Sequence, residues 1–395
     1  MKMNSSLIRL ISIGSLDAIK DIYLNIFLIA RIYDLADNAT KTIALYYIIE
    51  YACIAITMIV GGNYFKQKPN NGLRVGMMVN LILLLFIMRL DDQIIVYYPI
   101  VACIFGIAMG TYYGPMQVLL GHFADADSVG YSTISTMLYN IVNIVFPITI
   151  GAYIETTSFF SVTLCMVVVT SIEMLLSLGI SKIQNSQKCN LYAFLKVLKD
   201  NRNYKIINVY VIVFLKGITS SVLDRTVLIL IMMMFGSIMQ LGILSTIFSI
   251  FTVTASWIVK KLCKGDIKKW LIKISAIMPM LAVILLVINT STETFILYKA
   301  VSATFICILS VLADASRYNT IGDLKKTYAA EHQNLSELSL AAGRITGLTI
   351  LIIVNEFIGG LIAIKAMLLI IGMVIIAYAS FIAKGQNYDN VMEVK

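Results

Sequence analysis

Charged residues are scarce in this sequence of 395 residues, at 13% of the chain, whereas 59% of the residues are apolar. Soluble domains carry about 25% charged and roughly 45–50% apolar residues. So few polar side chains cannot cover the surface of a soluble globule of this length. The composition excludes a cytosolic enzyme, a disordered protein and a nucleic-acid-binding protein, and it predicts a polytopic membrane protein in contact with lipids.

Residues that build metal and catalytic centres are few as well. The chain has only two histidines, and its six cysteines include no close pair with zinc-ligand spacing. It has no His-Glu-x-x-His pattern and no glycine-rich phosphate-binding loop, so neither a metalloprotease nor an ATP-driven protein is indicated. The sequence predicts a protein that is not an enzyme, with no catalytic residues, no cofactor and no metal.

Long apolar runs fill most of the chain. A helix that crosses a bilayer needs about 20 mostly apolar residues, and twelve such runs can be counted. The runs are 6–31, 40–61, 73–89, 94–120, 130–154, 158–181, 206–233, 238–259, 270–289, 294–316, 335–358 and 361–383. The expected fold class is an all-α membrane protein with twelve transmembrane helices and no separate soluble domain.

Lysine and arginine gather in alternate loops. The loops after the second, sixth, eighth and tenth runs hold eighteen of them, whereas the opposite loops hold only Arg31, Lys41 and Arg89. Basic loops stay on the cytoplasmic side of a membrane, so we expect both termini in the cytoplasm and the protein in the inner (cytoplasmic) cell membrane. The net charge of +9 then reflects topology and indicates no nucleic-acid partner.

The longest loop divides the chain into two halves of six runs each. Residues 1–181 are expected to form an N-terminal six-helix bundle and residues 206–395 a C-terminal one. Residues 182–205 would be a basic cytoplasmic linker between them. Within this linker, Leu191–Leu198 is expected to lie on the anionic inner leaflet as an amphipathic helix.

The two halves also share a basic turn between their second and third runs. These turns, Gly61–Gly76 and Val259–Ile274, lie 198 residues apart, as expected for parallel repeats of a transporter. The first turn resembles the signature loop of the major facilitator superfamily, Gly-x-x-x-Asp-Arg-x-Gly-Arg-Arg. Gly62 and Arg74 have counterparts in that pattern, whereas Lys66 stands where the family has aspartate.

A second resemblance lies in the fifth run. The drug-antiporter branch of the superfamily carries a Gly-Pro pair there, and this chain keeps Pro147 and Gly151 but has Phe146 in place of the glycine. The resemblance implies two pseudo-symmetric six-helix bundles that rock around a solute site between them. It also implies equivalent places for the first and seventh helices beside that site.

Three polar residues and a glycine share one face of the first run, because Gly14, Asp17, Asp21 and Asn25 are three or four positions apart. A charge at mid-bilayer costs roughly 2.5–3.5 kcal/mol. Asp17 and Asp21 are therefore candidates for solute binding or for carrying a coupling proton. The alternative for Asp17 is an ion pair with Lys20 that only holds the first helix to its neighbours.

Other polar candidates of the N-terminal half lie at mid-membrane positions. Glu50 is flanked by tyrosines in the second run, Tyr113 and Gln117 share a face of the fourth, and Asn140 and Asn143 share a face of the fifth. Each is a candidate for binding or coupling. The alternative is hydrogen bonding between packed helices, which we favour for the fourth and fifth runs.

In the C-terminal half, Lys216 and Asp224 share a face of the seventh run, with Arg225 next to Asp224. Asp224 is the candidate expected to face the solute site, and Arg225 is expected to reach towards the membrane surface. Arg344 is a second candidate, because its planar charged group suits a carboxylate or sugar hydroxyls. Lys299 is expected to face the outer vestibule.

Three residues near the cytoplasmic ends of the tenth and eleventh runs, Asp314, Arg317 and Glu337, are candidates for an inner-gate ion network. The alternative is that they are solvated helix ends. Glu173 and Lys365 are expected to be charges at helix ends without a role in the site.

These observations favour a secondary active transporter of a small polar, anionic or zwitterionic solute, coupled to protons or, as a second choice, sodium. We expect a monomer, with protonation of Asp17 shifting the equilibrium between inward- and outward-open states. One alternative is a proton-driven multidrug efflux pump, suggested by the many methionines and tyrosines. An alternative of another class is a membrane protein without transport activity, such as a scramblase, a sensor or an assembly partner.

Overall fold

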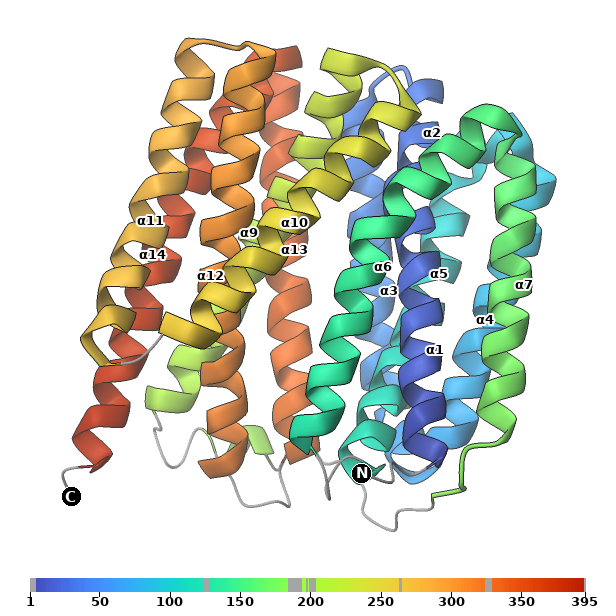
Figure 1. The fold of residues 1–395 in the computed structure, drawn as a ribbon, viewed down its shortest axis with the longest axis horizontal. Helices are drawn as coiled ribbons and strands as arrows, with labels where there is room; N and C mark the ends of the chain where they lie inside the picture. The colour runs from blue at the N-terminus through green and yellow to red at the C-terminus, as the bar shows by residue number, and fades with distance from the viewer. Residues whose placement is uncertain are drawn as a thin grey trace. The chain divides into compact units, whose positions relative to one another are not determined.

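The structure is a computed structural model that describes residues 5–123, 128–183, 194–196, 198, 204–262, 265–323 and 329–393. Every element in these ranges is helical, and they contain no strand (Figure 1). This confirms the predicted all-α class. The chain divides into unit 1, which comprises Met1–Cys189 and Ile231–Ile247, and unit 2, which comprises Asn190–Leu230 and Phe248–Lys395.

Unit 1 is built from helices that run from the N-terminus to Leu178. They are α1 (Ser5–Ile22), the π-helix η1 (Tyr23–Phe27), α2 (Leu28–Leu35), α3 (Ala39–Gln67), α4 (Pro69–Leu90), the 3-10 turn η2 (Asp91–Gln93), α5 (Ile94–Phe123), α6 (Ser128–Thr156) and α7 (Phe159–Leu178). α5 packs against α3 and α4, while α1 packs against α6 and α7 (Figure 1).

Unit 2 contains most of the remaining helices. They are α9 (Tyr204–Phe235), α10 (Ile238–Leu262), α11 (Gly265–Ile288), α12 (Thr292–Asp323), α13 (Ala329–Ile358) and α14 (Gly360–Glu393). The last turn of α9 and the first part of α10 belong to unit 1. Within unit 2, α11 packs against α12 and α14 (Figure 1).

Ten helical stretches in the described part of the chain are long and apolar enough to cross a membrane. One of them, Pro69–Leu120, contains α4 and most of α5, which are joined by η2. The continuous helix from α1 to α2 is not among the ten, and it carries the charges Asp17, Lys20 and Asp21.

Most helix ends lie a few residues beyond the apolar runs that predict them. α3 continues to Gln67, past the predicted end at residue 61, and α12 continues to Asp323, past residue 316. The prediction follows the hydrocarbon thickness, whereas the backbone hydrogen bonds of a helix continue into the polar turns that follow.

Glycines allow close helix packing within each unit. A Cβ on Gly106 of α5 would collide with the carbonyl oxygen of Glu50 on α3, and one on Gly343 of α13 would collide with the carbonyl oxygen of Phe214 on α9. Only hydrogen fits at these contacts. This is the close approach of backbones that small residues allow between membrane helices.

Most of the linker segment that we expected on the inner leaflet lies outside the described residues. Of its apolar residues, Phe194 and Leu198 are described, and both are buried against Ile206 at the start of α9. Leu335 of α13 also packs there. These two side chains therefore contact unit 2 and not lipid, because α9 and α13 present an apolar surface to them.

Candidate functional site

The most buried charges of unit 1 surround Lys20, whose side chain is 0% exposed. Its Nζ lies 2.5 Å from Oδ1 of Asp17, one turn earlier in α1, and 3.3 Å from Oε2 of Glu173 on α7. The ammonium also lies 5.5 Å from the centre of the Tyr112 ring on α5. We call Asp17, Lys20, Asp21 and Glu173 the Lys20 cluster.

The expectation that Glu173 is a helix-end charge is wrong. Its side chain is 0% exposed and faces Lys20. Glu173 lies within the apolar run of α7, where it has no neighbouring cation in the sequence. The packing of α1 against α7 brings the positive charge of Lys20 to it. The sequence did carry a sign that Glu173 is paired. Burying an isolated charge is costly, so each charge within an apolar run needs a partner of opposite charge.

Asp21 extends the Lys20 cluster towards the surface of unit 1. Its Oδ2 accepts a hydrogen bond from the Tyr113 hydroxyl at 2.8 Å. Tyr113 is 40% exposed, and Gln117, one turn later on α5, is exposed too. Two residues that were predicted separately, Asp21 and Tyr113, are thus joined by a hydrogen bond between α1 and α5.

Glu50 is buried on α3 and is 4% exposed. It interacts electrostatically with Asp21. One turn before it, the hydroxyl of Tyr47 donates to the carbonyl oxygen of Asn25 at 3.1 Å. That carbonyl belongs to the π-helix η1, directly after the Lys20 cluster. Single-turn π-helices are rare and occur often at functional sites.

The asparagines predicted on the fifth run have a more local role. The amide of Asn143 donates to the backbone carbonyl oxygen of Tyr139 in its own helix, α6, at 2.8 Å. Asn140 is half-buried on the same helix. This contact stays within one helix, so it supports neither the binding interpretation nor hydrogen bonding between packed helices.

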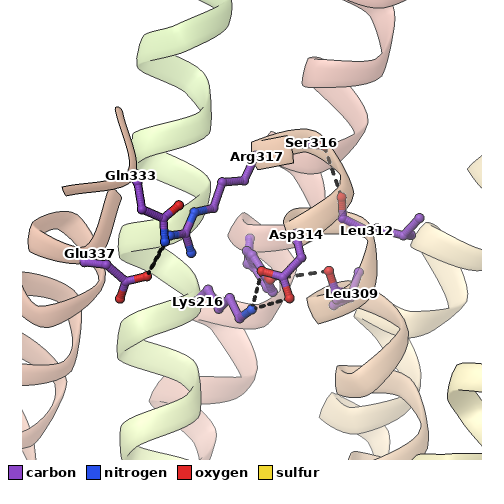
Figure 2. A network of polar contacts seen from close by, with 9 residues as sticks. Lys216, Leu309, Leu312, Asp314, Ser316, Arg317, Gln333 and Glu337 are labelled. Carbon is purple, nitrogen blue, oxygen red and sulfur yellow. Dashed lines mark hydrogen bonds and ion pairs between the residues drawn. The ribbon is translucent and has the colours of Figure 1, made fainter. Parts of the chain in front are cut away.

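Unit 2 holds a second group of charges, which we call the Lys216 network: Lys216, Asp314, Arg317, Gln333 and Glu337 (Figure 2). Nζ of Lys216 on α9 contacts both carboxylate oxygens of Asp314 on α12, at 2.7 and 2.8 Å. Arg317 on α12 pairs with Glu337 on α13 at 2.6 Å. Gln333 donates to the same Glu337 oxygen at 3.3 Å.

The three predicted inner-gate residues therefore belong to two ion pairs. Arg317 and Glu337 contact each other, whereas Asp314 pairs with Lys216, which was grouped with Asp224 in the sequence. The two pairs connect α9 to α12 and α12 to α13. No spacing within one helix could reveal the Lys216–Asp314 contact, because it joins residues 98 positions apart.

The other predicted residues of unit 2 have contacts of their own. Asp224 is exposed and interacts electrostatically with Lys299, while its neighbour Arg225 is buried. The ammonium of Lys299 lies 5.8 Å from the centre of the Phe248 ring. Arg344 is half-buried on α13, where its backbone carbonyl oxygen accepts from Ser221 of α9.

A contact that the sequence did not predict lies at the start of α13. His332 is 0% exposed, and its Nδ1 lies 2.7 Å from the hydroxyl of Tyr210 on α9. Phe194 of the linker packs edge-on against the imidazole ring. This histidine fixes the start of α13 to α9, close to the Arg317–Glu337 pair.

No protein-family model and no curated protein matches this sequence. Solved structures match it in fold over nearly its whole length. The nucleoside transporter NupG has a TM-score of 0.69 at 14% identity, covering 96% of this chain and 99% of NupG. A POT-family transporter in complex with 5-aminolevulinic acid has a TM-score of 0.68 at 12% identity, covering 94% of both chains.

A bacterial homologue of the human lysosomal transporter Spinster, in an inward-facing and unoccupied conformation, is similar as well. Its TM-score is 0.67 at 10% identity, covering 97% of this chain and 96% of that one. Identities this low show the fold and do not carry a substrate over. The chain shares the fold of these transporters over nearly its whole length, as the resemblance seen in its sequence predicts.

Proposed function

We propose that this protein is a secondary transporter that moves a small anionic or zwitterionic solute by alternating access and is coupled to protons. In this proposal, twelve spans form two six-helix bundles. The observation that carries it is the Lys20 cluster, in which three carboxyl groups accompany one lysine inside a membrane helix bundle.

The Lys20 cluster has an excess of acid. With Asp17, Asp21 and Glu173 ionised, the single charge of Lys20 leaves a net charge of −2. Uncompensated charge in an apolar interior is costly, and a bound proton relieves that cost. A proton that binds one of these carboxyls in one state and leaves it in the other would couple its own movement to the change of state.

The choice among the three carboxyls follows from their surroundings. Tyr113 connects Asp21 to the exposed side of α5, whereas Asp17 and Glu173 share Lys20 in the interior. A proton would reach Asp21 first. Protonation of Glu173 would then weaken its ion pair with Lys20, which is one of the contacts between α1 and α7.

The solute class rests on the cations of unit 2. Lys216 and Arg344 are only partly buried, and each offers a charged donor that suits the anionic group of a solute. The POT-family neighbour holds 5-aminolevulinic acid, a small zwitterion, which gives one concrete compound to test on this chain.

The test is a proton-flux assay with purified protein in liposomes that carry an internal pH indicator. Organic acids, amino acids including 5-aminolevulinic acid, nucleosides and cationic drugs are added singly. We expect one anionic or zwitterionic class to move protons, and we expect Asp17→Asn and Glu173→Gln to lower that flux at least tenfold. Flux driven only by cationic drugs would overturn the solute class.

The matched control is Glu293→Gln, an acid-to-amide change at an exposed position in the first turn of α12. It is expected to leave the flux unchanged. If solute moves without protons in the wild type, the transporter stands and proton coupling fails. If no compound moves with the folded protein, the transport proposal itself fails.

A further inference from the structure

The two buried ion systems differ in how open they are. In the Lys20 cluster, the side chains of Lys20, Asp17 and Glu173 are 0%, 5% and 0% exposed. In the Lys216–Asp314 pair, the lysine is 22% and the aspartate 39% exposed. Lys20, Asp17 and Glu173 are therefore closed to solvent, whereas the Lys216–Asp314 pair is partly open to it.

Both residues of the open pair lie within the apolar spans of their helices. Lys216 is about 15 Å along the axis from the start of the span of α9 at Ile206, and Asp314 is about 5 Å from the end of the span of α12 at Arg317, at 1.5 Å per residue. Charged side chains within an apolar span face a protein interior or a water-filled space, since exposure to hydrocarbon is costly. The exposed side of this pair therefore faces water.

The geometry of the pair is that of a bound carboxylate. Nζ of Lys216 lies 2.7 and 2.8 Å from the two oxygens of Asp314, so both oxygens share one ammonium (Figure 2). The other nearby acid, Glu337, is held by Arg317 and Gln333. If Asp314 turned away, Lys216 would face water with no carboxylate of its own in contact.

We propose that Lys216 binds the anionic group of the solute and that Asp314 occupies the same ammonium when no solute is present. The inference rests on the proposed transporter function and adds the residue that recognises the charge of the solute. An incoming carboxylate or phosphate would replace Asp314 at Lys216. The ammonium of Lys216 would then keep one anionic partner throughout the exchange, which avoids leaving a lysine unpaired in the membrane.

The test measures anion access directly and needs no identified solute. In a variant with all six native cysteines replaced, Asp314→Cys places a thiol beside Lys216. Its rates with an anionic sulfonate-bearing methanethiosulfonate and with a cationic trimethylammonium analogue are measured in folded, detergent-solubilised protein. Thr292→Cys, at an exposed position on the first residue of the same helix, normalises the intrinsic reactivities.

We expect the anionic reagent to be favoured at position 314, and Lys216→Gln to lower the normalised anionic-to-cationic ratio about tenfold, because one nearby charge is removed. If Lys216→Gln leaves the ratio of the two reaction rates unchanged, the proposal is overturned. It is also overturned if neither reagent reaches the thiol at position 314 while Thr292→Cys reacts, since the pair would then be closed to water.

A second measurement covers the case in which Asp314→Cys does not fold. The native Cys307 on α12 interacts electrostatically with both Lys216 and Asp314 and can serve as the only thiol. Asp314→Asn should raise its preference for the anionic reagent, and Lys216→Gln should lower it. A preference that stays the same in both variants would overturn the proposal, because the pair would then present no charge to an incoming anion. These experiments measure thiol reaction rates and not solute transport. A negative result in them can therefore be distinguished from a negative result in the liposome assay.

Discussion

Lys20 is the residue on which the charge balance of unit 1 depends. It contacts one carboxylate of its own helix and one of α7, and its side chain has no exposure to solvent. Without it, two buried carboxylates would face each other with no cation. Removing one partner of a buried ion pair is costly because the remaining charge is left uncompensated.

We therefore expect Lys20→Met to lower the free energy of unfolding by about 3–5 kcal/mol. Thermal unfolding of the detergent-solubilised protein measures this loss. Combining Lys20→Met with Glu173→Gln should recover part of it, because one of the two stranded carboxylates becomes neutral. An unchanged melting temperature in Lys20→Met would contradict the role of Lys20 in compensating the two buried carboxylates.

The control is an exposed ion pair of the same unit. Asp92 pairs with Arg31, and its side chain is 66% exposed. Asp92→Asn should change the free energy of unfolding by less than about 1 kcal/mol, since water screens a surface pair.

At the residue scale, the sequence predicted which charges matter better than it predicted their partners. Asp17, Asp21, Asp314 and Glu337 stood out because a charge in an apolar run is costly wherever its helix packs. The apolar run around Glu173 indicates that it needs a partner, but the pairings Lys20–Glu173 and Lys216–Asp314 could not be predicted, because each joins helices that are far apart in the chain. Spacing within a helix carries no information on such contacts.

At the scale of elements, α9 and α13 meet through glycines on both helices. A Cβ on Gly343 would collide with the Phe214 carbonyl oxygen and would lie 3.2 Å from Cα of Gly217. The same α9–α13 contact also carries the Tyr210–His332 hydrogen bond. The close approach of α9 and α13 therefore depends on the absence of side chains at these glycines.

Gly343→Ala should accordingly destabilise the protein by about 1–3 kcal/mol through overpacking. A comparison of melting temperatures tests this. Gly14→Ala is the matched control within a helix, because its added Cβ would lie 3.5 Å from the flexible end of Met116, an ordinary contact. It should be neutral or stabilising by up to about 1 kcal/mol. Equal losses in both variants would mean that the α9–α13 contact is looser than described.

Helix positions were predictable for a simple reason. An apolar run must be as long as the bilayer is thick, so composition alone locates the runs. The π-helix η1 was not predictable, since its sequence Tyr23–Phe27 is an ordinary apolar stretch. The contact that accompanies it comes from Tyr47 on another helix.

At the scale of the whole molecule, the fold is shared with transporters that are only 10–14% identical. Membrane helices need apolar surfaces of the right length and few specific side chains, so a hydropathy pattern can persist while residues change. The same tolerance explains why the fold could be predicted here and the solute could not.

The distribution of basic residues predicts the orientation of the whole molecule. In a cysteine-free variant, Thr292→Cys should react with a membrane-impermeant maleimide added to intact cells. Lys269→Cys, at an exposed position near the start of α11, should react only after permeabilisation. The reverse pattern would place the termini outside the cell.

The ion contacts of Lys20 also impose an order on the synthesis of the chain. Glu173 follows Lys20 by 153 residues, and a ribosome adds about 5–20 residues per second. For about 8 to 30 s, α1 exists without α7, and Asp17 is the only one of the two contacting carboxylates that has been made. A carboxylate three positions away lets the nascent helix enter the membrane with its lysine already neutralised, before the rest of the bundle is made.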